Sequence, residues 1–453
     1  MSALAVAEEA VAACAADEAL AHVTHERSLL LRFAGNRPTQ ATAVDDTTVE
    51  IAVLVDGQLG RALTNETHAE ALRACAARAA VAATAAALAA KPSGYPGFPA
   101  AGAVRPHAGH DAETAALDPA AGGAALATIF AAAKRRGLAA HGIWTVAECE
   151  RAVATSAAGG SLDRATDALL KLICIAPNGR SGYAGAMGTA AASLGVEQLA
   201  ETAATKALAP GEPAELSLGS YPVVLEPRAV GCLLELLGGT ALDGLAHAEG
   251  RGAFVDRLGK SVAAPSINLA DSPFFGATLP RAFDAEGTPK RPLPLIQDGV
   301  ARGVVHDVRS AALAGAESTG HALEPGGGAD GPRPRNLVLA GGGAADAQEL
   351  CAPIERGVYV TRFWYENVVR PKETLVTAVT RDGTFLIEDG RIARPLRDLR
   401  MTDTLLGVLS RVQAIAARQQ LTSEGEFYDR RDAHGVVAPA LRASSMRFTG
   451  ATG

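Results

Sequence analysis

A zinc-peptidase helix needs two histidines one turn apart with a glutamate beside the first, because the histidines hold the metal and the glutamate polarises its water. In this sequence only His25 is followed by glutamate, at Glu26, and Leu29 or Leu30 stands where the second histidine is required. The segment also has the pattern of a strand, so we predict no zinc site there. We interpret two close histidine pairs as surface side chains: His22 with His25, and His107 with His110.

Phosphate-binding and nucleophile signatures are incomplete as well. Gly259-Lys260-Ser261 matches the end of a P-loop, but Phe254 replaces the glycine that would bend the backbone around phosphates. Gly341-Gly342-Gly343 lacks the rest of a dinucleotide fingerprint and predicts a plain loop. Ser318 and His321 are too close in sequence to fit a known triad order. These segments therefore predict neither a nucleotide site nor nucleophilic catalysis.

Two carboxylates stand close together in the segment Phe283-Asp284-Ala285-Glu286-Gly287. Such a pair can serve acid catalysis or bind a cation. Aspartate followed three positions later by glycine is also typical of a turn. We interpret the segment as a turn pinned by Asp284 and Gly287. From the residues alone, the chain has no strong active site.

Composition limits the remaining functions. The 453 residues are 48% hydrophobic and only 4% aromatic, so we expect two or three units with cores of Ala, Val and Leu. The net charge of −7 argues against a general nucleic-acid binder. Six scattered cysteines are typical of a reduced, cytosolic protein. We also expect no signal peptide and no membrane span, hence a cytoplasmic location.

The expected elements divide the chain into two halves, 1–215 and 216–453. The first is predicted to be an N-terminal α/β half with antiparallel strands and long Ala-rich helices, broken internally near 92–118. Its helices are expected over 3–20, 65–90, 119–136 and 195–208. Its strands are expected over 28–33, 39–44, 49–55, 60–64, 140–155, 164–176 and 181–188, with turns at Asp45-Asp46 and Asp56-Gly57.

The second half is predicted to be β-rich, which makes the fold class α+β. A strand over 221–225 leads into a helix over 227–237, whose first position suits Pro227. Residues 250–310 predict β structure with many turns, and 324–335 predict a loop. Further strands are expected over 358–369, 375–381, 384–388 and 391–392, with a hairpin at Asp389-Gly390 and a helix near 403–417.

Several segments together resemble the TldD/PmbA family, over nearly the whole chain. The most specific lie after residue 215, and weaker matches lie at 181–183 and 49–90. The specific segments are 283–289 (Phe-Asp-Ala-Glu-Gly-Thr-Pro), 295–300 with His306-Asp307, Glu317-Ser318-Thr319-Gly320, 357–365 (Gly-Val-Tyr-Val-Thr-Arg-Phe-Trp-Tyr), Arg370-Pro371 and 380–390.

The family resemblance implies a specific place for zinc. TldD-like members carry His-Glu-x-x-x-His on the helix after a Pro-Val-Val-Leu-like strand, and a later Cys completes the site. Here Pro227 and Arg228 stand at the first two motif positions and Cys232 at the last, and the later ligand position falls near Thr380 or Arg381. Proline has no ligand atom and arginine is a permanent cation. We therefore predict no metal in this chain.

Loss of the motif resembles the TldE (PmbA) side of the family. The resemblance implies a non-catalytic subunit that pairs with a TldD-like, zinc-bearing subunit as a heterodimer. The two would enclose a chamber in which unfolded or modified peptides are cut. Segment 357–388 would help hold the peptide extended, with Arg362, Trp364 and Arg381 as candidate contacts. Two alternatives remain: an independently active hydrolase or tailoring enzyme on a small or modified peptide, and a peptide-binding scaffold.

Overall fold

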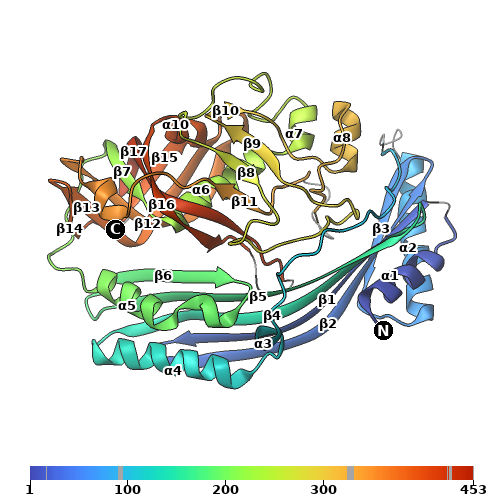
Figure 1. Ribbon diagram of the computed structural model, residues 1–453, viewed down its shortest axis with the longest axis horizontal. Helices are drawn as coiled ribbons and strands as arrows, with labels where there is room; N and C mark the ends of the chain where they lie inside the picture. The colour runs from blue at the N-terminus through green and yellow to red at the C-terminus, as the bar shows by residue number, and fades with distance from the viewer. Residues whose placement is uncertain (17, 90–94, 324–330, 426, 428–430, 452–453) are drawn as a thin grey trace.

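The computed structural model describes residues 1–16, 18–89, 95–323, 331–425, 427 and 431–451. Two sheets organise these residues (Figure 1). The first contains six strands in the order β3-β2-β1-β4-β5-β6, and the second contains eleven. The first sheet lies below the second in Figure 1, and its long strands continue past the second sheet toward the N-terminal helices.

All neighbouring pairs in the first sheet are antiparallel. Its hairpin turns use residues that tolerate positive φ, as the tight turns between twisted strands require. Asp56 and Gly57, at φ +48° and +73°, confirm the predicted turn between the second and third strands. The strands are β1 (Glu18–Ala34), β2 (Arg37–Val55), β3 (Gln58–Thr64), β4 (Ala139–Thr155), β5 (Gly160–Ile175) and β6 (Ser181–Gly188).

Ala-rich helices cover the first sheet in two separate cores. Helices α1 (Ala3–Ala12) and α2 (Ala69–Ala89) pack over one end of the sheet. Helices α4 (Pro119–Arg135) and α5 (Val196–Ala207) pack over the other. The short elements α3 (Ala112–Ala115) and η1 (Ala191–Leu194) lie beside them.

Glycines in the strands let these helices come very close. A Cβ on Gly60 in β3 would overlap the backbone of Ala79 and Ala83 in α2, and a Cβ on Gly182 in β6 would overlap that of Ala203 and Ala207 in α5. Small residues on both sides therefore set the helix–sheet distance. This close approach explains how a core with few aromatic side chains still packs densely.

We expect Gly60→Ala to lower the free energy of unfolding by about 1–3 kcal/mol, because the added methyl must displace α2. Urea unfolding measures the loss. Gly123 in α4 is the matched control, because it is exposed and a Cβ there meets no atom within 4 Å. Gly123→Ala should stabilise the helix by about 1 kcal/mol. Equal effects of the two substitutions would contradict the close-packing interpretation.

Helix α2 is also long and apolar enough to cross a membrane, judged only by its length and composition. Over Ala69–Leu88 its mean hydropathy is 1.4, and a third of the stretch is buried. The core helix of a soluble protein meets the same criteria. Leu72, Cys75, Ala79 and Ala83 are fully buried against the sheet. The absence of a membrane span stays a prediction.

The second sheet contains a closed ring. Strand β7 (Gly219–Leu225) pairs with both β12 (Arg356–Arg370) and β17 (Gly435–Ala451). The ring order is therefore β17-β15-β13-β12-β7, with β13 (Leu375–Glu388) and β15 (Leu399–Thr404) between. The other strands are β8 (Leu269–Asp271), β9 (Leu293–Gln297), β10 (Val300–Ala301), β11 (Leu337–Leu339), β14 (Arg391–Pro395) and β16 (Val412–Ser423).

Helix α6 (Pro227–Thr240) follows β7 directly and packs against β17, β12 and β16. Its apolar side chains belong to the largest core of the protein, which includes Val230, Leu234 and Leu237. The smaller helices lie around this body: α7 (Gly244–Ala248), α8 (Val308–Ala314), α9 (Ala347–Cys351), α10 (Leu405–Ser410) and the turn η2 (Pro371–Glu373).

Three local predictions were wrong. The helix expected over 3–20 ends at Ala12, and β1 begins at Glu18. Asp45-Asp46 is no turn, because β2 continues through it and pairs both aspartates with Arg27 and Glu26 of β1. The helix expected near 403–417 is the short α10 followed by β16, whose pairing with the unpredicted β17 outweighs local helix propensity. Of the loop expected over 324–335, residues 324–330 lie outside the described part.

Candidate functional site

The start of helix α6, where the family resemblance expects zinc ligands, is fixed by Glu226. This residue is the N-cap of α6, and Pro227 follows at the first helical position. Three side chains hold the Glu226 carboxylate: Lys206 of α5 donates at 2.8 Å, Tyr359 at 2.8 Å and Thr361 at 3.2 Å. Because Lys206 belongs to the first half of the chain, this carboxylate also joins the two sheets. The pyrrolidine of Pro227 offers no donor atom there.

Arg228, at the second motif position, forms a partly buried ion pair. Its Nη1 donates to both carboxylate oxygens of Glu424 at 2.6 and 2.7 Å. Thr422 donates to the same carboxylate at 2.9 Å. Burial raises the pKa of Glu424, and Arg228 opposes that shift. A side chain on Gly231 would overlap Thr422, so this glycine leaves room for the ion pair.

Cys232, at the last motif position, is 4% exposed. Its Sγ lies 3.2 Å from the carboxylate Oε1 of Glu366. Burial, followed by the charges of Glu366 and Glu424, raises the pKa of its thiol well above the usual value. Metals are bound by the thiolate. The raised pKa of Cys232 therefore weakens metal binding, because a metal would have to displace the thiol proton.

The family's later ligand position lies on β13. Thr380 is buried there, and its hydroxyl accepts from the Leu399 amide at 2.9 Å, while Arg381 is exposed. Over the described ranges, no group of three or more His, Cys, Asp or Glu side chains is arranged to hold a metal ion. The side chains at the four motif positions do not fit zinc, because they offer a pyrrolidine, a guanidinium, a protonated thiol and an engaged hydroxyl.

Arg362, a predicted peptide contact, is buried rather than free. Its guanidinium makes two hydrogen bonds to one carboxylate oxygen of Asp382. Ser181 of β6 donates to the same carboxylate at 2.6 Å. The guanidinium also lies over two rings, 5.0 Å from the Tyr183 centroid and 5.1 Å from that of Trp364. Arg362 therefore positions Trp364 and Tyr183 and links the two sheets.

Trp364 and Arg381, the other two predicted contacts, are exposed and lie on neighbouring strands. Trp364 is 45% exposed, and Arg381 pairs directly with Arg362 across the β12–β13 ladder. Strand β12 pairs with β7 only over Val358–Val360. Beyond Val360, the structure as described places no second strand on that edge of β12. A free strand edge is the element to which an extended peptide can add.

Sequence reasoning missed the acidic partners of this site. Glu424 lies 196 positions from Arg228, Glu366 lies 134 positions from Cys232, and Asp382 lies 201 positions from Ser181. No local pattern marks these residues, because the strands that carry them are brought together only by sheet pairing. A cation at a motif position that is normally acidic was the one available signal, since a buried arginine requires a carboxylate.

The histidines are tied to carboxylates. His25 pairs with Asp45 at 2.9 Å, His107 with Asp163 at 2.7 Å and His110 with Glu148 at 2.8 Å. His22 and His25 are three positions apart on β1, so their side chains point to opposite faces of the sheet. His22 is buried and the His107 side chain is 7% exposed, so the prediction of surface side chains was wrong for these two. His25 and His110 lie at the surface, as predicted.

The glycine-rich candidates are ordinary loops. Lys260 and Ser261 are exposed in a turn, in which Gly259 has φ +77° and donates to Ala301 at 2.8 Å. Gly341 and Gly342 pack directly on the backbone of β16, so no space for a phosphate opens above them. The predicted turn and loop are confirmed, and the absence of a nucleotide site stays a prediction.

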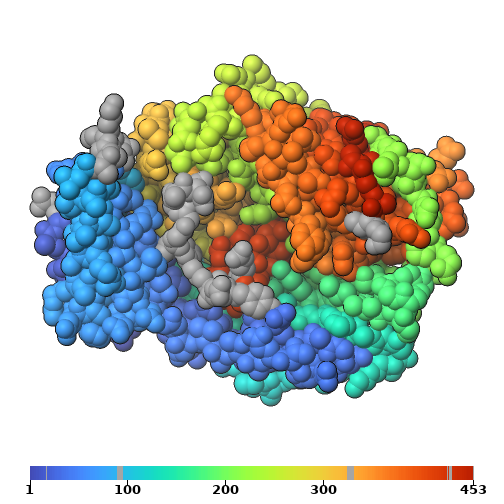
Figure 2. Space-filling model, turned by 180° about the vertical axis from the view of Figure 1, so that it is seen from behind, coloured from blue at the N-terminus to red at the C-terminus, as the bar shows by residue number. Residues whose placement is uncertain are grey.

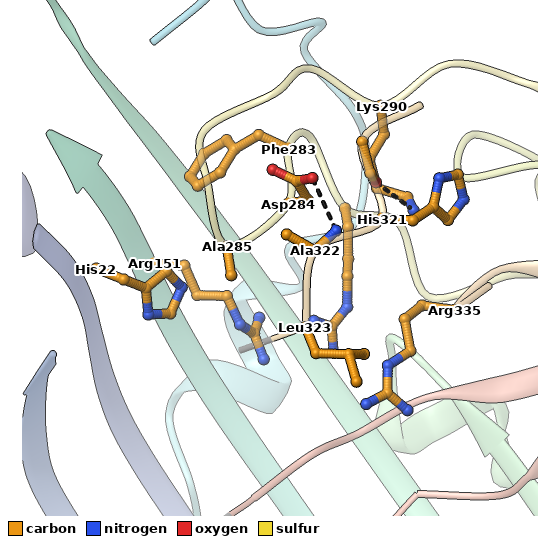
Figure 3. A pocket seen from close by; sticks show the side chains of 12 residues that line it. His22, Arg151, Phe283, Asp284, Ala285, Lys290, His321, Ala322, Leu323 and Arg335 are labelled. Carbon is orange, nitrogen blue, oxygen red and sulfur yellow. Dashed lines mark hydrogen bonds between the residues drawn. The ribbon is translucent and has the colours of Figure 1, made fainter. Parts of the chain in front are cut away.

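The two carboxylates at 283–287 form the predicted turn. Asp284 accepts from the Glu286 and Thr288 amides at 3.0 and 2.9 Å, and Gly287 has φ +80°. Figure 3 shows this turn beside a cavity that also meets His22 and Arg151 of the first sheet. The cavity measures about 20 Å³, roughly the room needed by one water molecule. It is therefore too small for a peptide.

Lys290 and His321, which line this cavity, belong to a buried set of polar side chains that the sequence did not bring together. His321 Nε2 lies 3.2 Å from Asp271 Oδ1, Lys290 Nζ lies 3.5 Å from the same oxygen, and Thr319 Oγ1 lies 2.9 Å from His321 Nδ1. The Thr319 hydroxyl accepts from the His306 amide at 2.7 Å. It is thus engaged in fixing the backbone, and Ser318 likewise bonds the His306 carbonyl.

Comparison with known families agrees with this architecture. The family model described as PmbA/TldA metallopeptidase C-terminal domain matches residues 218–450, and the one described as PmbA/TldA metallopeptidase domain 1 matches residues 23–83. The first match alone covers more than half of the chain. The chain belongs to the PmbA/TldA metallopeptidase family, which confirms the resemblance found in the sequence.

Individual relatives give the same result. A metalloprotease TldD homolog of Haemophilus influenzae is 27% identical over 51% of this chain and 48% of that protein. A metalloprotease of Methanothermobacter thermautotrophicus is 24% identical over 44% and 43%. The chain therefore spans about half the length of the curated relatives it matches. The crystal structure of TldE from Thermococcus kodakarensis matches with a TM-score of 0.85, at 20% identity over 98% of this chain and 99% of that one, which confirms the α+β fold.

Proposed function

We propose that this chain is the non-catalytic subunit of a heterodimeric zinc peptidase, with a TldD-like chain as its partner. The observation that carries the proposal is the partly buried Arg228–Glu424 ion pair at the start of helix α6. In the catalytic members this is the place of the carboxylate that activates water. A permanent cation there repels zinc and cannot act as a general base. The chemistry then belongs to the partner.

The free edge of β12 supports a role in holding the substrate. Trp364, Tyr365, Val368 and Val369 are 39–68% exposed along this edge. An extended peptide could pair with the edge through its main chain and pack its side chains on these apolar groups. Main-chain pairing is largely independent of sequence, which suits unfolded or modified peptides as substrates.

Co-expression with a family member that carries an intact His-Glu-x-x-x-His motif tests the proposal. We expect native mass spectrometry to show a mixed dimer with one zinc ion, which stays with the other polypeptide after separation. Peptide cleavage should require both chains, because the metal belongs to the partner and the chamber is complete only in the mixed dimer. Cleavage by this chain alone would instead favour an independently active hydrolase, and peptide binding without any mixed dimer would favour a scaffold.

A further inference from the structure

Lys171 lies on β5 with its charged end at the junction of the two sheets. It is half-buried, and its Nζ lies 5.7 Å from the centroid of the Phe427 ring. The charged groups that act on it are Arg228, Arg362 and Glu424. Across the residues that the structure describes, Lys171 forms no ion pair. A half-buried ammonium beside two guanidinium groups, with no carboxylate partner among the described residues, is a place where an anion would bind favourably.

The neighbouring cations are already neutralised. Arg228 is paired with Glu424, and Arg362 is paired with Asp382. Glu366 accepts from the Cys232 thiol and acts on Arg228 rather than on Lys171. Within the described part of the chain, the charge of Lys171 therefore has no carboxylate of its own. Burial, followed by repulsion from Arg228, lowers the pKa of Lys171 to about 8. A bound anion would reverse the repulsion and keep the ammonium charged.

One aromatic ring lies over this charge, and two more lie at the neighbouring Arg362. Arg362 lies over Tyr183 and Trp364, and Phe427 lies over Lys171 and 5.0 Å from Arg431. Trp364 belongs to the free edge of β12 along which the proposed peptide would lie. An anion at Lys171 would thus be partly screened from water, where a charge-assisted hydrogen bond is stronger than in open solvent.

We propose that Lys171 is a subsite for a carboxylate of the bound peptide, either its C-terminal group or an acidic side chain. The inference rests on the proposed role of β12 in holding a peptide. Lys171 would anchor the carboxylate through a charge-assisted hydrogen bond, and Trp364 and Tyr183 would cover the adjoining residues. The chain would then supply substrate selectivity to the complex while the partner supplies the chemistry.

Intrinsic fluorescence of the isolated chain can measure this binding. The protein has two tryptophans, of which Trp144 is 2% exposed and Trp364 is 45% exposed, so a change on binding reports on the site. The probes are acetyl-tetra-alanine with a free C-terminus, its C-terminal amide, and an acetylated tetrapeptide amide with one glutamate. We expect the free acid to bind about 10- to 100-fold more tightly than the amide. Tight binding of the glutamate peptide would assign the subsite to acidic side chains, and weak binding would assign it to the C-terminus.

Substitutions of Lys171 distinguish the effect of its charge from the effect of its shape. Lys171→Met should remove the preference for the acid, Lys171→Arg should retain most of it, and Lys134→Met on the exposed face of α4 should leave it unchanged. Equal affinity of all three peptides in the wild type, including no binding of any of them, would overturn the inference, as would an unchanged preference for the carboxylate-bearing peptide in Lys171→Met. A mixed, active dimer that shows no such preference would leave the proposed function intact, whereas absence of the dimer would reject that function independently.

Discussion

Arg431→Met is expected to lower the free energy of unfolding by about 3–5 kcal/mol, because it leaves Asp167 buried without its partner. Arg431 is nearly inaccessible and donates from two nitrogens to both oxygens of Asp167 on β5. Its third nitrogen donates to Thr145 of β4 at 3.0 Å. This arginine joins the segment before β17 to the first sheet, so its loss should also loosen the junction. Urea unfolding of the isolated chain measures the effect.

Two further variants test the cause of that loss. Arg370 forms an exposed ion pair with Glu373, so Arg370→Met should cost less than about 1 kcal/mol. The double variant Arg431→Met/Asp167→Leu should recover much of the stability, since replacing both partners removes the uncompensated charge. A double variant no more stable than Arg431→Met alone would show that the loss comes from packing and not from the unpaired carboxylate.

Elements with a strong local signal were predictable from the sequence. The helices at 119–135 and 196–207 and the strands at 139–155 and 181–188 appear nearly as expected, because caps, glycines and apolar periodicity mark their ends. The closure of β7 on β17 was not predictable. β17 carries small alternating residues whose strand character comes from its partners β15, β16 and β7. Pairing across the whole second half, rather than local propensity, decides these strands.

The residues of the candidate site were likewise predictable only in part. Pro227, Arg228 and Cys232 could be identified because they occupy a motif with fixed spacing. Their environment could not be identified, because Glu424 and Glu366 arrive from distant strands. The prediction that Arg362 contacts a peptide was made without knowledge of Asp382, which engages its guanidinium. Lys171, which has no carboxylate partner among the residues that the structure describes, carries no sequence signal at all.

Glu286→Gln is expected to remove a loss of stability that the wild type shows as the pH rises. Burial, followed by the charges of Asp284 and Asp307, raises the pKa of Glu286 to about 8. Tyr95 donates to Glu286 at 2.8 Å and the Val308 amide donates at 2.9 Å, so its protonated side chain ties the first half of the chain to the second.

The direction in which the free energy of unfolding changes with pH follows from proton binding. Between the unfolded pKa near 4.5 and the folded value near 8, the folded protein retains a proton that the unfolded chain has lost. Stability contributed by this group is therefore fully present below pH 4.5 and falls as the pH rises, by at most about 1.4 kcal/mol per pH unit. A neutral glutamine has no proton to lose. Its advantage over the wild type should grow from pH 5 to pH 8 and then level off.

Urea unfolding at several pH values between 5 and 9 tests this expectation. Glu355→Gln, at an exposed glutamate, is the matched control and should leave the wild-type pH dependence unchanged. A constant difference between Glu286→Gln and wild type at every pH would mean that Glu286 is ionised in the folded protein. The carboxyl at the Tyr95 contact would then be an ordinary charged acceptor, and the junction between the two sheets would be insensitive to alkaline pH.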